Sequence, residues 1–157
     1  MRLRILALAL ALLLVAGSAL PALAAADLAA ALDYVRTQQN ADGGFGSGFG
    51  PGSTVGSTAD VVMAIVAAGG DPAAFVQDGN STLDYLAANA ATVANAGDLA
   101  KRMMAAVAAG ENPRTFGGTD SVARLEGMVG AGGRIGTAND TFVSHLLGVL
   151  ALASVRR

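Results

Sequence analysis

An internal repeat of an apolar segment is the feature that most constrains this chain. Val62–Pro72 and Met103–Pro113 align without a gap, and in both an apolar run at helical spacing leads into glycine and then proline. A shorter Leu-Asp-Tyr motif recurs in Leu32–Val35 and Leu83–Leu86, and a weaker third copy begins at Leu125. Alanine-rich helices of this kind bury their apolar faces only by stacking. We therefore expect about three helical hairpins of about 40–50 residues each.

The rest of the chain also follows helical spacing, and no alternating strand pattern of useful length occurs. The prediction is an all-α fold without a sheet. We expect six principal helices, over residues 27–39, 57–68, 81–93, 98–109, 120–129 and 140–155. A short helical turn should open at Asp71–Pro72, and Ser81 should cap the third helix with Asp84 in its first turn. Gly43–Gly56 is expected to be the longest irregular segment, because glycine is so frequent there.

Composition excludes several classes of protein. The 157 residues are 53% hydrophobic with a mean hydropathy of +0.51, which is too apolar for a disordered tail. The chain has no cysteine, so disulfides, a thiol nucleophile and thiolate metal sites are excluded. A single histidine, His145, excludes a multi-histidine metal centre. The net charge of −2, without any basic run, argues against nucleic acid as a partner.

The N-terminal segment Met1–Ala26 has the pattern of a secretory signal peptide. Two arginines precede the apolar run Ile5–Val15, and small residues allow cleavage after Ala24 or Ala26. The alternative is an uncleaved anchor, but the run is shorter than the roughly 20 residues of a membrane span. We expect cleavage, no stable membrane span afterwards, and a secreted or periplasmic bacterial protein whose mature domain is residues 27–157.

The most specific motif is Gln39–Phe45, with the sequence Q-N-A-D-G-G-F. A glutamine at a helix end can bond exposed carbonyls, Gly43 and Gly44 permit a sharp reversal, and an aromatic ring can fix the loop to the core. We therefore interpret Gln39, Gly43, Gly44 and Phe45 as a structural motif, with Phe45 buried and Asp42 exposed. The alternative is a flexible linker of biased composition.

The motif resembles the Q-x-x-x-G-x-aromatic repeat of the prenyltransferase and squalene-cyclase superfamily. Gln39, Gly43 and Phe45 match its three defined positions, and Gly132–Gly136 looks like a degenerate copy. The resemblance implies an α/α toroid, in which inner and outer helices alternate and the motif fastens helix ends. A closed toroid of that type has about six hairpins, so about three hairpins here would form an incomplete or open array.

The resemblance implies chemistry that is not visible in this sequence. The aspartate-rich D-x-D-D acid of the cyclases and the cysteine of the zinc prenyltransferases are both absent, and aromatic residues make up only 4%. Asp60 and Asp140 are expected as helix caps or dipole partners, Lys101–Arg102 as a solvent-facing pair, and His145 as a structural or groove-facing side chain. Met103–Met104 is expected to fill the core. We expect no catalytic residue, no metal and no cofactor.

Two functions remain open at this point, beside the possibility that the chain is a degraded or truncated reading frame with no independent role. The first is a secreted, non-catalytic α/α repeat module that binds a small ligand or a partner on its groove face. The second is a fragment or relative of a terpenoid-cyclase or prenyltransferase-like enzyme. Because the apolar side of the last helix, around Phe142, Leu146, Val149 and Leu150, has no neighbour in a three-hairpin array, we also expect it to be exposed and open to self-association.

Overall fold

The computed structural model describes residues 28–50 and 52–156. The chain divides into two compact units, Met1–Thr37 and Gln38–Arg157, which are described separately. The described part of the first unit is a helix over residues 28–37, on which Arg36 and Asp33 form an exposed ion pair with a nitrogen–oxygen distance of 2.9 Å. The expected signal peptide, residues 1–26, and its cleavage sites lie outside the described residues.

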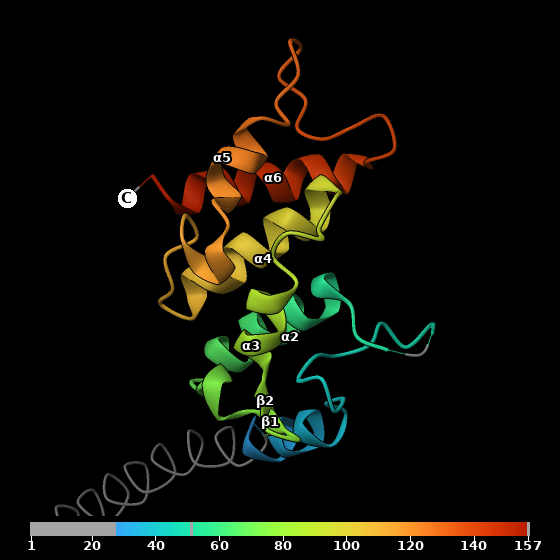
Figure 1. Ribbon diagram of the computed structural model, residues 1–157, viewed down its shortest axis with the longest axis vertical. Coiled ribbons are helices and arrows are strands. Elements are labelled where there is room, and N and C mark those ends of the chain that lie inside the picture. Colours follow the sequence, from blue (N-terminus) through green and yellow to red (C-terminus); the bar gives the residue numbers. More distant parts are fainter. Residues whose placement is uncertain (1–27, 51, 157) are drawn as a thin grey trace, which may run out of the picture. The chain divides into compact units, whose positions relative to one another are not determined.

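Three helices of equal length form the frame of the second unit. Helices α2 (Val55–Ala67), α4 (Ala96–Ala108) and α6 (Phe142–Ser154) each contain 13 residues. Each begins after a polar residue whose side chain accepts a hydrogen bond from the backbone N–H three positions later. These N-caps are Thr54, Asn95 and Thr141. Helix α4 lies between α2 and α6 and packs against both (Figure 1).

Helices α2 and α4 end in the same way, as the internal repeat predicts. Gly69 and Gly110 have φ angles of +79° and +80°, in the left-handed region that glycine adopts without strain. In both cases the next backbone N–H bonds to a carbonyl inside the last helical turn, at 2.9 and 2.8 Å. A short helix follows each, η1 (Pro72–Ala74) after α2 and η2 (Phe116–Gly118) after α4.

The shorter helices α3 (Thr82–Ala88) and α5 (Ser121–Glu126) alternate with the long ones. The predicted cap of α3 is confirmed, because the Ser81 side chain accepts from the Asp84 N–H and the Asp84 carboxylate accepts from the Ser81 N–H. The predicted extension of this helix to Val93 is wrong. Asn89 ends it by donating its side-chain amide to the Tyr85 carbonyl, and Val93 joins the core from an irregular segment.

The predicted all-α character is confirmed, but the expected absence of any sheet is wrong in one place. Strands β1 (Val76–Gln77) and β2 (Asn80–Ser81) form an antiparallel pair in which Val76 lies opposite Ser81. Asp78 and Gly79 connect them with φ angles of 50° and 85°, the geometry of a tight hairpin turn that Asp-Gly favours. Apart from this hairpin and a single bridge at Val129 and Ile135, the described residues are helical or irregular, with six α-helices.

The first turns of α2, α4 and α6 lie side by side. A Cβ added to Gly56 would overlap the Asp98 carboxylate of α4, and a Cβ added to Gly97 would lie 3.0 Å from the Ser144 hydroxyl of α6. Gly56 was expected in the preceding loop, but Thr54 starts α2 earlier. The glycine is needed inside the helix because it lets α4 approach closely. This contact outweighs the low helix propensity of glycine, which costs about 1 kcal/mol relative to alanine.

The core of this unit has two parts, and α4 contributes to both. The part on the α6 side contains Leu99, Met103, Val122, Leu125, Ile135 and Ala151. The part on the α2 side contains Ala59, Val62, Tyr85, Leu86 and Ala105. Met103 is fully buried and Met104 packs against the same cluster, which confirms their expected role in the core.

Candidate functional site

The motif Gln39–Phe45 folds into one compact turn. The Gln39 side-chain amide donates to the carbonyls of Gly43, at 2.9 Å, and of Phe75, at 2.8 Å, so it ties the turn to the end of η1. Gly43 has a φ of +83°, and a Cβ there would overlap the Ser81 carbonyl. Phe45 is only 4% exposed, which confirms the expected burial of its ring, and Asp42 is exposed.

The same turn recurs before α6. In the first turn, the Asn40 N–H donates to the Gly44 carbonyl, and the Gly43 N–H donates to the Asn40 carbonyl. In the second turn, Gly130 takes the role of Asn40 and Arg134 takes the role of Gly44. Gly133 has a φ of +77°, close to that of Gly43, and Ile135 is 4% exposed, as Phe45 is. The segment 132–136, identified in the sequence as a degenerate copy, therefore keeps the backbone geometry although the glutamine and the aromatic ring are absent.

Each turn is fastened to the helix that follows it. Phe45 N–H donates to the hydroxyl of Thr58 at 2.9 Å, and Ile135 N–H donates to Nδ1 of His145 at 3.1 Å. Thr58 and His145 occupy the same position, four residues after the N-cap of α2 and α6 respectively. Because Nδ1 accepts this bond, the proton of the neutral imidazole is on Nε2. His145 thus has the structural role expected of it.

Arg102 overturns the expectation of a solvent-facing pair at Lys101–Arg102. Its side chain is fully buried, and it donates to the carbonyls of Leu86 at 3.0 Å and Phe116 at 2.8 Å and to the Ser121 hydroxyl. Burial lowers the pKa of Arg102 to about 10, with a smaller contribution from the positive charge of Arg124. The guanidinium joins the ends of α3, η2 and α5, and is therefore a structural cross-link.

The two aspartates expected as caps have different roles. Asp140 does cap a helix, but it caps α4, by accepting from the Ala96 N–H at 3.0 Å. Burial acts to raise the pKa of Asp140, but hydrogen bonds from Thr137 and from the first N–H groups of α4 outweigh it, and the pKa lies below its ordinary value. Asp60 lies within α2 and pairs with Lys101 at 2.6 Å.

Exposed apolar side chains gather on α6 and beside it. The exposed fraction is 73% for Phe142, 45% for Leu146, 47% for Val149 and 58% for Leu150. This confirms that the outer side of the last helix is uncovered. In the described part of this unit, the remaining exposed large apolar side chains are Phe49, Val76, Val129 and Val143.

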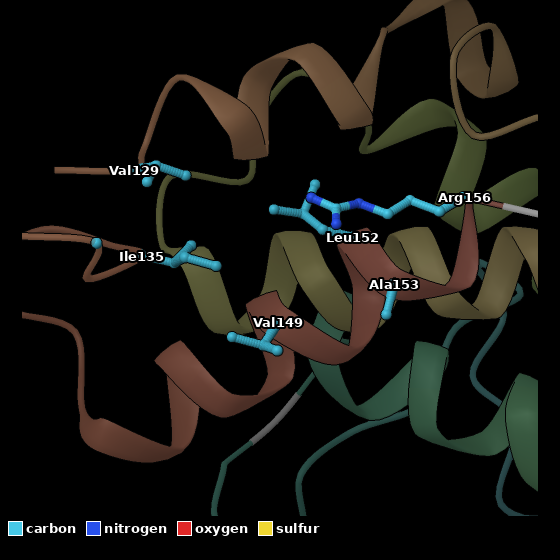
Figure 2. A pocket seen from close by; sticks show the side chains of 7 residues that line it. Val129, Ile135, Val149, Leu152, Ala153 and Arg156 are labelled. Carbon is cyan, nitrogen blue, oxygen red and sulfur yellow. The ribbon is translucent and has the colours of Figure 1, made fainter.

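A cavity of about 270 Å³ opens between α6 and the turn before it (Figure 2). We call it the α6 pocket, and its lining residues are Val129, Gly133, Ile135, Val149, Leu152, Ala153 and Arg156. Figure 2 shows the Arg156 side chain extending from the end of α6 over the apolar walls. Within the described part of the chain, no carboxylate pairs with this guanidinium. The pocket can therefore hold an apolar group beside an unneutralised positive charge.

The motif residues Gln39, Gly43, Gly44 and Phe45 do not contribute to the α6 pocket. Sequence reasoning missed the pocket because Val129 and Ile135 come from an irregular segment, and Arg156 gave no signal beyond its charge. The one available signal was the alignment of Ile135 with Phe45, which places a buried apolar residue in the turn that precedes the last helix.

No known protein-family model matches the chain, and neither a curated protein nor a solved structure matches it. In the described residues, no group of three or more His, Cys, Asp and Glu side chains could hold a metal ion. A search of the same residues finds no helix with the length and apolar character needed to cross a bilayer.

Proposed function

We propose that this chain is an exported, non-catalytic α/α repeat module of the toroid type, and that it binds an apolar ligand or partner group at the α6 pocket. The observation that carries the proposal is the pocket itself, in which apolar walls from two elements meet Arg156, an arginine without an ion-pair partner among the described residues. Ligand sites in proteins commonly combine apolar walls with a few placed polar groups.

The repeat architecture supports the toroid-type assignment. Short and long helices alternate along the unit, and the three long helices have equal length and adjacent first turns. The turn before α2 recurs before α6 with the same hydrogen bonds. An arrangement of inner helices α2, α4 and α6 with shorter outer helices accounts for these features.

The size and charge of the α6 pocket define the chemistry of its ligand. Its volume of about 270 Å³ is just below the roughly 300–1,000 Å³ typical of ligand sites, so a small apolar group fills it. Arg156 favours a ligand that also carries a carboxylate, sulfonate or phosphate, because charge-assisted hydrogen bonds to anions are about twice as strong as neutral ones.

Fluorescence titration with anilinonaphthalene sulfonate, an apolar ring system with one anionic group, tests the proposal. We expect saturable binding to the native chain. Arg156→Gln should weaken it about tenfold, the equivalent of one charge-assisted contact. Ala153→Leu should abolish it by filling the pocket. Arg114→Gln, which changes an exposed arginine outside the pocket, is the matched control and should bind normally.

Circular dichroism establishes that each variant is folded. Equal affinity of the native chain, Arg156→Gln and Ala153→Leu for the probe would show that the α6 pocket is not the binding site.

A further inference from the structure

A second cavity, of about 350 Å³, lies beside α3 and falls within the roughly 300–1,000 Å³ typical of ligand sites. It shares no lining residue with the α6 pocket. We call it the α3 pocket, and its lining residues are Asp42, Asn80, Asp84, Tyr85, Ala88 and Asn89. These residues belong to the Gln39–Phe45 turn, to β2, and to α3 with its C-cap.

Direct contacts hold the three elements together around the α3 pocket. The Asn80 side-chain amide donates to the Ala41 carbonyl at 3.0 Å, which joins β2 to the turn. A Cβ added to Gly44 would lie 2.8 Å from the Tyr85 ring, so the turn also packs against α3. The fold therefore places the lining residues around the cavity without help from a ligand.

Two carboxylates border the α3 pocket, and each uses only one of its two oxygens within the described residues. One oxygen of Asp42 accepts from the Gly44 N–H at 3.0 Å and the Ser53 hydroxyl at 2.7 Å. One oxygen of Asp84 accepts from the hydroxyl and the N–H of Ser81, at 2.6 and 2.9 Å, and these bonds lower the pKa of Asp84. No ion pair among the described residues includes either carboxylate. The pocket therefore carries uncompensated negative charge and two free carboxylate oxygens.

Tyr85 supplies a buried hydroxyl that has no partner in the protein. Tyr85 is only 8% exposed, and its hydroxyl makes no hydrogen bond to the residues that the structure describes. Every fully enclosed side-chain oxygen and nitrogen in that part of the chain does have a partner, so the Tyr85 hydroxyl is open to the pocket that the residue lines. Burial, with a smaller contribution from the charge of Asp42, raises the pKa of Tyr85 and keeps the hydroxyl protonated. A buried hydroxyl without a protein partner is placed to bond a ligand.

The two amides of the pocket add further acceptors. The Asn80 amide nitrogen donates to the carbonyls of Ala41 and Asp78, and the Asn89 amide nitrogen donates to the Tyr85 carbonyl. The amide oxygens are therefore the atoms that both side chains keep available. Free oxygens on a negatively charged wall favour a cation with several N–H donors.

The size of the α3 pocket decides between the possible cations. Oxygen ligands lie only about 2.0–2.6 Å from a bound Mg²⁺ or Ca²⁺, so a bare metal ion leaves most of this cavity empty. A guanidinium group presents five N–H donors in one plane and gives up its hydration more readily than an ammonium group does. It can therefore reach acceptors that come from separate elements.

We propose that the α3 pocket binds the guanidinium group of a small molecule or of an arginine side chain in a peptide. The group bonds the free oxygens of Asp42 and Asp84, and the Tyr85 hydroxyl bonds the same ligand. This site is separate from the α6 pocket, which favours an anionic ligand.

Chemical-shift titration of the full chain in a low-salt buffer tests the site, because salt screens exposed charges. Butylguanidine is the small-molecule probe and N-acetylarginine amide is the peptide probe. We expect saturable shifts at Asp42, Asn80 and residues 84–89. Butylamine should bind about fivefold more weakly than butylguanidine, the equivalent of one hydrogen bond. The tighter of the two guanidinium probes identifies the source of the ligand, and either result supports the site.

Three variants separate binding from folding. Asp42→Asn keeps the acceptor for Gly44 and Ser53 but removes the charge, and should weaken butylguanidine binding about tenfold. Tyr85→Phe should weaken it about fivefold while the urea midpoint stays unchanged, because the hydroxyl has no protein partner to lose. Ala88→Leu should abolish binding by filling the cavity. Glu126→Gln removes an exposed carboxylate outside the pocket and is the matched control for Asp42→Asn.

Several results would overturn the guanidinium site. One is the absence of saturable shifts with both guanidinium probes. A second is equal affinity for butylamine or calcium chloride, which would indicate an unselective acidic surface. A third is an equal effect of Asp42→Asn and Glu126→Gln on butylguanidine binding.

Discussion

Substitution of Arg102 by methionine tests the claim that this buried guanidinium is a structural cross-link. Methionine has a similar reach and no donor, so the change removes the hydrogen bonds to the Leu86 and Phe116 carbonyls and to the Ser121 hydroxyl. The Phe116 carbonyl keeps a backbone partner in Thr119, whereas Leu86 lies in the last turn of α3, where carbonyls have no helical donor.

The expected loss of stability follows from the two acceptors that lose their partner, the Leu86 carbonyl and the Ser121 hydroxyl. Each buried acceptor left unsatisfied costs about 1–3 kcal/mol. Removing a buried cation from a site that lowers the pKa of Arg102 to about 10 returns part of this cost. We expect Arg102→Met to lower the free energy of unfolding by about 2–4 kcal/mol.

Urea denaturation followed by far-ultraviolet circular dichroism is the appropriate assay, because the chain has no tryptophan. Lys101→Met is the matched control. It removes only a partly exposed ion pair with Asp60 and should cost less than about 1 kcal/mol. If Arg102→Met and Lys101→Met change the stability equally, the cross-link has no energetic importance and the reasoning is refuted.

Four further substitutions probe the turns and the cap of α4. Phe45→Ala should lower the free energy of unfolding by about 3–5 kcal/mol because the ring is buried, and a urea midpoint close to that of the unmodified chain would show that the segment is only a linker. Gly43→Ala should be clearly more destabilising than Gly133→Ala by the same assay. Both glycines have positive φ, but only Gly43 has a backbone carbonyl where the Cβ would lie. Equal losses of stability would contradict the close packing of the first turn. The pKa of Asp140 is lowered in the folded chain, so its ionised form stabilises the fold at any pH above the ordinary pKa of 3.8. This stabilisation is lost as the pH falls through the lower folded-state pKa. Asp140→Asn should therefore flatten the loss of stability below about pH 4, and an unchanged acid profile would exclude the cap.

Helical spacing and capping residues were sufficient to predict the number and order of the helices. The glycine after each repeat copy marked the ends of α2 and α4, and Ser81 with Asp84 marked the start of α3. These signals are local, because a cap or a left-handed residue acts on its own helix. The burial of Phe45 was predictable for the same reason, since its motif is contiguous.

The errors arise where tertiary contacts decide. Gly56 was placed in a loop because the contact with Asp98 that keeps it inside a helix joins residues far apart in the sequence. Arg102 was expected in solvent because of its charge, although its spacing from Leu99 and Ala106 puts it on the buried side of α4. The hairpin at Asp78–Gly79 was missed for a different reason: a tight turn with two-residue strands is too short to give an alternating pattern.

Chemical-shift mapping by nuclear magnetic resonance tests the proposed binding function most directly. Isotope-labelled chain is titrated with anilinonaphthalene sulfonate, and the backbone amide shifts of every residue are followed. The account predicts that saturable changes concentrate at Val129–Ile135 and Val149–Arg156, the two segments that line the α6 pocket. Changes centred on the Gln39–Phe45 turn, or spread evenly without saturation, would contradict a binding site at the α6 pocket.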